Sequence, residues 1–158
     1  MATLTVTHTE TLILNGKEVG SNNTFNITGV DMVYSRIMKS VASATTTLVT
    51  FKATESTSDS AISVSEAKYI RITNLDSTNA VNLGLAIDAT DNGADQNCTI
   101  LLGAGQTFVM GVAANGIQAH DNEGGAITQG ALDNLESIEV HGGSNSVSLE
   151  VFVAGTEG

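Results

Sequence analysis

Apolar and polar residues alternate with a period of two in several segments of this chain. In 81–88 and in 147–153, every second residue is a large aliphatic one. Because successive side chains of a β-strand point to opposite faces, this pattern predicts strands with one buried face. Similar short segments recur along the chain at the spacing typical of a sandwich or barrel.

Turn sequences separate the alternating segments. Asn15-Gly16, Asn92-Gly93 and Asn115-Gly116 supply the positive φ angles that tight hairpin turns require. The segment 30–41 is ambiguous, since its apolar residues fit both helical and alternating spacing, and its β-rich surroundings favour a strand. We therefore expect an all-β fold, an antiparallel two-sheet sandwich of the jelly-roll or a related Greek-key type, with a small closed barrel as the second choice.

The chain length fits one domain. No linker and no repeat of fixed period divides its 158 residues, so we expect a single β-sandwich domain over 1–158. Aromatic residues make up 4% of the chain and there is no Trp, so the core must be built from Val, Ile, Leu and small residues. The single cysteine, Cys98, excludes an internal disulfide and is expected to be a buried, inert thiol.

Charge is unevenly distributed along the chain. Residues 1–71 hold six basic and six acidic residues, whereas residues 72–158 hold eleven acidic residues and no Lys or Arg. The net charge of −11 therefore comes from the second half. Such a surface repels phosphate backbones, so we expect no binding to nucleic acid.

The chain shows no membrane signal. No apolar run approaches the roughly 18 residues of a membrane-spanning helix, and the N-terminus lacks a basic, apolar leader. We expect a protein made in a cytoplasm and not inserted in a membrane.

A search for catalytic residues is negative. His120-Asp121 resembles half of a nucleophilic triad, but no Ser occupies a Gly-x-Ser-x-Gly elbow and nothing marks an oxyanion hole. The three histidines are not spaced like metal ligands on one element. We expect no enzymatic activity, no catalytic residues and no cofactor.

One acidic loop is a weak metal candidate. Asp88, Asp91 and Asp95 surround the Asn92-Gly93 turn and supply the hard oxygen ligands that Ca²⁺ prefers. The spacing departs from the EF-hand pattern and lacks its closing Glu. Two interpretations stay open, a calcium site and a solvated acidic loop.

Three residues are candidates for an interface. Phe152 lies on the polar side of the last alternating segment, and Tyr69 and Arg71 lie on the face opposite Ile70 and Ile72. An aromatic residue in such a place indicates a subunit contact or packing against a second sheet, and a Phe on a polar face can also be covered by a loop.

Three parts of the sequence together form one succession of strands and turns. A strand is followed by an Asn-Leu-Asp-Ser-Thr-Asn turn, a Leu/Gly strand, a Gly-Ala-Gly-Gln turn and a closing pair of strands, in 69–85, 100–110, and 135–141 with 147–154. Over about residues 69–155, this order resembles small virion proteins of tailed bacteriophages. The resemblance implies a non-enzymatic capsid decoration (cement) protein that binds and stabilises the outer capsid surface. The alternative is a receptor- or glycan-binding head-fibre or tail accessory module.

The resemblance also implies partners and a location. The partners are the major capsid protein or other virion proteins, and the location is the virion. We expect a homo-oligomer, with a trimer favoured by icosahedral symmetry axes and by small outward residues such as Gly84 and Ala86. The neutral residues 1–71 would face the shell and the acidic residues 72–158 the medium.

Overall fold

The computed structural model describes residues 1–52, 61–63, 65–87, 96–111, 118–119 and 133–156. These residues form strands and turns, without a helix. The strands are β1 (Ala2–Thr9), β2 (Ile13–Leu14), β3 (Lys17–Glu18), β4 (Asn22–Val30), β5 (Met32–Lys39), β6 (Thr45–Lys52), β7 (Ala61–Ser63), β8 (Ala67–Asn74), β9 (Val81–Ile87), β10 (Gln96–Leu102), β11 (Thr107–Gly111), β12 (Gln118–Ala119), β13 (Asp133–His141) and β14 (Ser148–Gly155).

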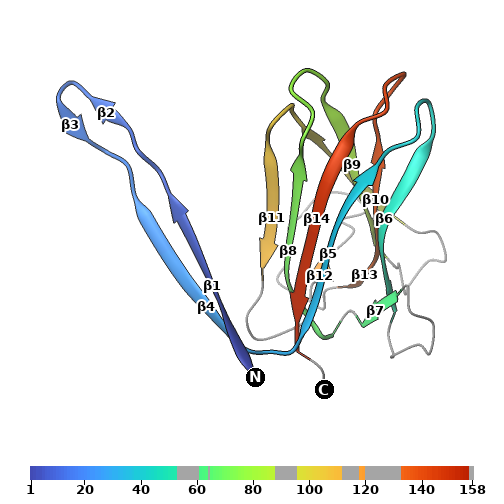
Figure 1. Ribbon diagram of the computed structural model, residues 1–158, viewed down its shortest axis with the longest axis horizontal. Helices are drawn as coiled ribbons and strands as arrows, with labels where there is room; N and C mark the ends of the chain where they lie inside the picture. Colours follow the sequence, from blue (N-terminus) through green and yellow to red (C-terminus); the bar gives the residue numbers. More distant parts are fainter. Residues whose placement is uncertain (53–60, 64, 88–95, 112–117, 120–132, 157–158) are drawn as a thin grey trace.

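Two sheets form the body of the protein (Figure 1). One has the order β10–β9–β13–β6–β7, with β12 added on β13, and the other has the order β11–β8–β14–β5. Neighbouring strands are antiparallel except for the short parallel pair β6–β7. The predicted antiparallel two-sheet sandwich is therefore confirmed.

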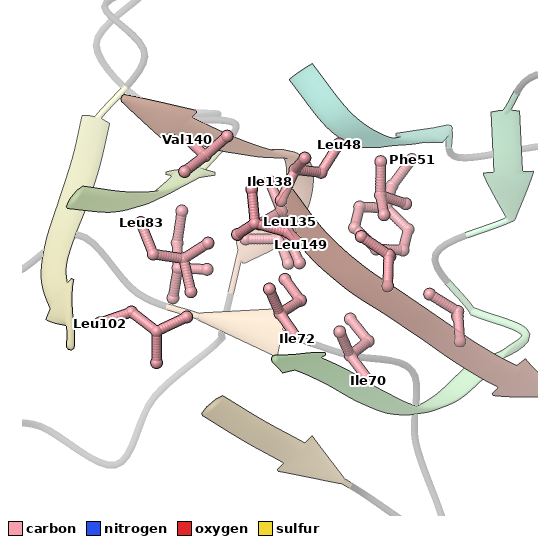
Figure 2. Close-up of a cluster of buried hydrophobic side chains, with 14 of the residues drawn as sticks. Leu48, Phe51, Ile70, Ile72, Leu83, Leu102, Leu135, Ile138, Val140 and Leu149 are labelled. Carbon is pink, nitrogen blue, oxygen red and sulfur yellow. The ribbon is translucent and has the colours of Figure 1, made fainter. Parts of the chain in front are cut away.

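The core lies between the two sheets and is almost entirely aliphatic (Figure 2). Leu83 and Ile138 from one sheet, and Ile72, Leu149 and Val151 from the other, are 0% exposed. These are the positions that the alternation predicts to point inward. Phe51 is the aromatic member of this buried cluster, so the core does consist largely of Val, Ile and Leu as the composition requires.

The ambiguous segment 30–41 contains a strand, β5, as its surroundings favoured. β5 is an edge strand, paired along one side with β14. Its inward side chains Tyr34 and Met38 pack against the core, whereas Val33 and Ile37 point outward and stay exposed. Apolar residues on both faces of one strand account for the false helical spacing.

The prediction of a buried Cys98 is wrong, because this thiol is exposed. Cys98 has the inward parity of Leu102, which is 4% exposed, but β10 is the edge strand of its sheet. Period two decides which face a side chain is on, and it does not decide whether the opposite sheet reaches far enough to cover that face.

The charge division of the sequence does not follow the two sheets. Strands from 1–71 and from 72–158 alternate in the β11–β8–β14–β5 sheet. The neutral half instead supplies one side of the sandwich, where β5, β6 and β7 lie, and the acidic half supplies β10 and β11 at the other side. The charge of the sandwich therefore differs between its two side edges, and not between the outer faces of its two sheets.

One buried side chain, that of Asn74, joins the turn after β8 to the turn after β10. Asn74 is 0% exposed, and its Nδ2 donates to the carbonyl oxygens of Asn79 at 2.8 Å, Gly103 at 3.1 Å and Leu102 at 3.3 Å. The backbone N–H of Gly105 donates to the Asp76 carbonyl at 3.0 Å. The two turns, 24 or more residues apart in sequence, are thereby fixed to each other at one end of the sandwich.

Asp76 organises the first of these turns. Its Oδ1 accepts the backbone N–H groups of Asn79 and Thr78, each at 2.8 Å. These hydrogen bonds hold the pKa of the Asp76 carboxyl below its ordinary value of 3.8, because they stabilise the charged form. The turn residues of this motif thus have a structural role.

The first thirty residues lie outside both sheets. β1 pairs with β4 from Ala2 opposite Val30 to Thr9 opposite Asn22, and β2 pairs with β3 beyond them. Backbone hydrogen bonds from Glu10 to Ser21 and from Val19 to Leu12 continue the ladder between the two parts. We call residues 2–30 the arm and residues 10–21 the arm end. Figure 1 shows the arm leaving the sandwich near the chain termini and pointing away from it.

Candidate interaction site

The base of the arm packs on the outer face of the β11–β8–β14–β5 sheet. A second buried cluster, separate from the main core, joins Val6, Ile27 and Val30 of the arm to Tyr69 and Ala154 of the sheet. Half-buried side chains surround it, namely Leu4, Phe25, Val109 and Phe152. This contact attaches the arm to the sandwich through apolar burial.

Aromatic rings line the contact in a row. His8 stacks on Phe25 with ring centroids 6.1 Å apart, and Phe25 lies 6.4 Å from Tyr69. Tyr69 in turn meets Phe152 edge to face at 6.0 Å. Gly111 makes room for this row, because a Cβ there would stand 3.3 Å from Tyr69 Cδ2 and 3.6 Å from Phe25 Cζ. Such pairs add to the apolar burial that holds the arm base.

A polar group borders the aromatic row. Arg71 Nη1 lies 2.8 Å from Glu150 Oε2 and also donates to Thr73 Oγ1 at 3.2 Å, while the guanidinium lies 5.8 Å from the Phe152 ring centroid. An open crevice of about 260 Å³ lies beside it, between β1 and the sheet. Both members of the ion pair are one-third exposed, so water screens their attraction.

The arm contact also changes a titratable group. Burial raises the pKa of the Tyr69 phenol above its ordinary value of 10.0, and the nearby Arg71 charge offsets part of that rise. We therefore expect the pKa of Tyr69 to depend on whether the arm covers this face.

The structure brings all three interface candidates together. Phe152, Tyr69 and Arg71 lie on one sheet face, and Phe152 contacts both of the others. What covers Phe152 and Tyr69 is the chain's own arm, a paired hairpin rather than a loop. A subunit contact through these three residues stays a prediction.

Sequence reasoning missed the arm end. Leu12, Ile13, Leu14 and Val19 are 54%, 71%, 57% and 53% exposed, so four large aliphatic side chains gather uncovered around one turn. The turn itself was predicted: Asn15 and Gly16 have φ angles of 51° and 77°, as a two-residue hairpin turn requires. The available signal was the run of three consecutive aliphatic residues, which breaks the alternation of the surrounding sequence.

The outer face of the other sheet carries a polar hollow of about 270 Å³. Gly84 forms its floor, because it has no side chain and its neighbours Thr99 and Glu139 flank it in register. Asn82 and His141 pair at the next position along the same strands and also line it.

The hollow offers both hydrogen-bond donors and acceptors. His141 Nδ1 accepts the Gly143 backbone N–H at 3.0 Å, which leaves Nε2 to carry the proton of a neutral ring. A Glu139 carboxylate oxygen accepts a long hydrogen bond from Thr47 Oγ1 at 3.4 Å. Carboxylate, amide and imidazole around a shallow floor suit a ligand with several hydroxyl groups.

Two candidates from the sequence are not placed. Asp88, Asp91 and Asp95, and likewise His120-Asp121, lie outside the described residues. Within the described ranges, no group of three His, Cys, Asp or Glu side chains is arranged to hold a metal ion. The same residues contain no helix long and apolar enough to cross a membrane.

Fold and site together define a class, an antiparallel two-sheet β-sandwich that carries a protruding hairpin arm. The chain matches no protein-family model, no curated protein and no solved structure. Any assignment of function therefore rests on the geometry and on the resemblance of its turn-and-strand order.

Proposed function

We propose that this chain is a non-enzymatic structural virion protein that acts through protein–protein contact, most specifically a capsid decoration protein. The observation that carries the proposal is the arm end, where Leu12, Ile13, Leu14 and Val19 are all more than half exposed. Contiguous aliphatic surface on a projecting element is costly in water and marks a contact with another protein. An arm of this kind lets a small protein fasten to its neighbours in an assembly.

The strand order of the sandwich supports the proposal. Four strands of each sheet follow one another as β5–β14–β8–β11 and β6–β13–β9–β10. We interpret this as the order of a jelly roll, an architecture that viral capsid domains use. The support is by analogy of fold, since one fold serves many functions.

The distribution of charge agrees with attachment by one side. Arg36 and Lys39 on β5 and Lys52 on β6 lie at the side of the sandwich built from the neutral half. The acidic half would then face the medium and oppose non-specific adhesion. In this proposal the neighbours are the major capsid protein, other virion proteins and further copies of the chain, with trimers favoured at three-fold axes.

The test is binding to capsids of a tailed phage that encodes this chain, prepared without it. We expect the purified chain to sediment with these shells and to raise their melting temperature. A Leu12→Ser/Ile13→Ser/Leu14→Ser variant should bind more weakly, whereas Leu101→Ser, a matched change of a 70% exposed residue on the opposite sheet, should bind like the wild type. Shells that neither bind the chain nor gain heat resistance would contradict the proposal.

The polar hollow favours a second function, that of a glycan-binding head-fibre or tail accessory module. Jelly-roll sandwiches also occur as lectins, and the hollow provides donors and acceptors for sugar hydroxyls. The scarcity of aromatic residues argues against it, since none of the described Phe and Tyr side chains lines the hollow.

Gly84→Val separates the two functions. A Cβ at Gly84 would stand 3.9 Å from the nearest atoms of Glu139, which is an ordinary contact, so the variant should fold while its side chain fills the hollow. Glycan binding that is abolished by Gly84→Val would favour the second function. Shell binding that is unaffected by Gly84→Val would favour the first.

A further inference from the structure

We infer that the arm end docks on a second copy of this chain, on the outer face of its β5 strand. The inference rests on the proposed function, because both assign the arm to protein contact, and it names the partner and the receiving surface. Four observations on the arm and on β5 support it.

The first observation is the weak support of the arm end within its own chain. Residues 10–21 form a two-stranded ribbon beyond the arm base, and their aliphatic side chains stay more than half exposed. A two-stranded ribbon that buries no apolar face has marginal stability in water. A partner surface would supply the burial that its own sandwich does not.

The second observation is that the receiving face continues the one on which the arm base already packs. Val33 pairs in register with Ala154, a fully buried member of the arm-base cluster, and Ile37 pairs with Glu150. Paired residues of neighbouring strands lie on one face. The apolar surface under the arm therefore extends onto β5, where Val33 and Ile37 are 58% and 71% exposed.

The third observation is that one chain is not arranged to join its own two surfaces. Figure 1 shows β2 and β3 well apart from β5 and pointing away from the sandwich. Each copy therefore presents one exposed arm end and one exposed β5 face. A contact between unlike surfaces of identical chains can be made reciprocally by two copies or can close a ring.

The fourth observation concerns area and charge. The four aliphatic side chains of the arm end present on the order of 400 Å² of apolar surface, within the range of the largest patch on a typical monomer. Two reciprocal contacts, with β5 and a polar rim included, would bury roughly 1,200–2,000 Å², the usual size of a stable interface. The arm end carries Glu10, Glu18 and one Lys, and the outer face of β5 carries Lys39 on the same side as Val33 and Ile37, so the charge at that end of the face is complementary to the arm end.

Sedimentation of the purified chain without shells tests the inference. At about 100 µM, where contacts of micromolar affinity are saturated, we expect a dimer or ring larger than the 16.2 kDa monomer. The arm variant (Leu12→Ser/Ile13→Ser/Leu14→Ser) and a face variant (Val33→Thr/Ile37→Thr) should each weaken self-association by at least about a hundredfold, because the first loses three and the second two aliphatic side chains from the contact. Leu101→Ser is the matched control and should associate like the wild type.

Mixing the two defective variants gives the sharpest result. The arm variant keeps an intact face and the face variant keeps an intact arm, so an equimolar mixture should form a one-to-one complex although neither variant associates alone. Contact of arm with arm would leave the face variant associated, and contact of face with face would leave the arm variant associated. Either outcome, a monomeric wild type, or a mixture that stays monomeric would overturn the inference.

Failure here is distinguishable from failure of the proposed function. Wild-type chain that is monomeric but binds shells would remove the second copy as partner and leave the decoration function standing. Self-association through the arm end and the β5 face, without any binding to shells, would support the second copy as partner and contradict the decoration function. Circular dichroism of each variant confirms the β-fold before either measurement is used.

Discussion

Arg71 and Glu150 form an ion pair, with 2.8 Å between Nη1 and Oε2, at the border between the covered and the open parts of one sheet face. On one side of the pair lie Tyr69 and Phe152, which the arm base covers. On the other side lies Ile37, which pairs with Glu150 and is exposed. The pair therefore marks where intramolecular packing ends and where the proposed contact with a second copy begins.

The two partners of this ion pair should differ in their effect on stability. Glu150→Gln should lower the free energy of unfolding by less than about 1 kcal/mol, because the pair is one-third exposed and screened by water. Arg71→Ala should cost more, about 1–2 kcal/mol, since it also removes the hydrogen bond to Thr73 and the contact with the Phe152 ring. Urea unfolding measures both, and equal losses would show that the ion pair dominates.

Removal of Phe25 should release the arm from the sandwich. This half-buried ring contacts Tyr69 and His8, and Phe25→Ala should weaken docking of the arm base by about 1–3 kcal/mol. Hydrogen exchange should then quicken in β1 and β4 and stay unchanged in β9 and β13. Thr28→Ala, a change of an exposed residue on the other face of β4, is the control. Quicker exchange throughout the sandwich would contradict an arm that undocks separately.

Titration of Tyr69 should report whether the arm is docked. With the chain's other tyrosine removed by Tyr34→Phe, absorbance near alkaline pH should show a pKa above 10.0, because burial disfavours the phenolate. Adding Phe25→Ala should bring the pKa back toward 10.0. A raised pKa in the folded state contributes stability that is full below pH 10.0 and is lost as the pH rises through the higher value. If Phe25→Ala leaves the pKa of Tyr69 unchanged, the result would contradict coverage of Tyr69 by the arm.

Asn74 should be among the most sensitive polar positions of the sandwich. Asn74→Ala leaves the carbonyl groups of Asn79, Leu102 and Gly103 without their shared donor and should cost about 2–4 kcal/mol. Asn82→Ala, at an exposed asparagine of β9, should change the free energy of unfolding by no more than about 0.5 kcal/mol. Thermal unfolding of the two variants makes the comparison, and similar melting temperatures would show that the Asn74 hydrogen bonds contribute little.

The candidate site was predictable in part. The polar side of the last strand identifies Phe152, and the parity of β8 identifies Tyr69 and Arg71, but the pairing of β14 with β8 is what places the three on one face. Neither the covering of that face nor the exposure of Leu12, Ile13 and Leu14 follows from parity. Both depend on which other segment packs there, and alternation carries no information on the partner of a face.

The fold class, the inward residues of most strands and the Asn15-Gly16 hairpin follow from local sequence patterns, because period two and turn chemistry act within a few neighbouring residues. Long-range packing, by contrast, places the first hairpin outside both sheets, leaves Cys98 exposed on an edge strand and joins two distant turns through Asn74. Those features are set by contacts between residues far apart in sequence, and the free energy of such contacts depends on the geometry of the whole sandwich.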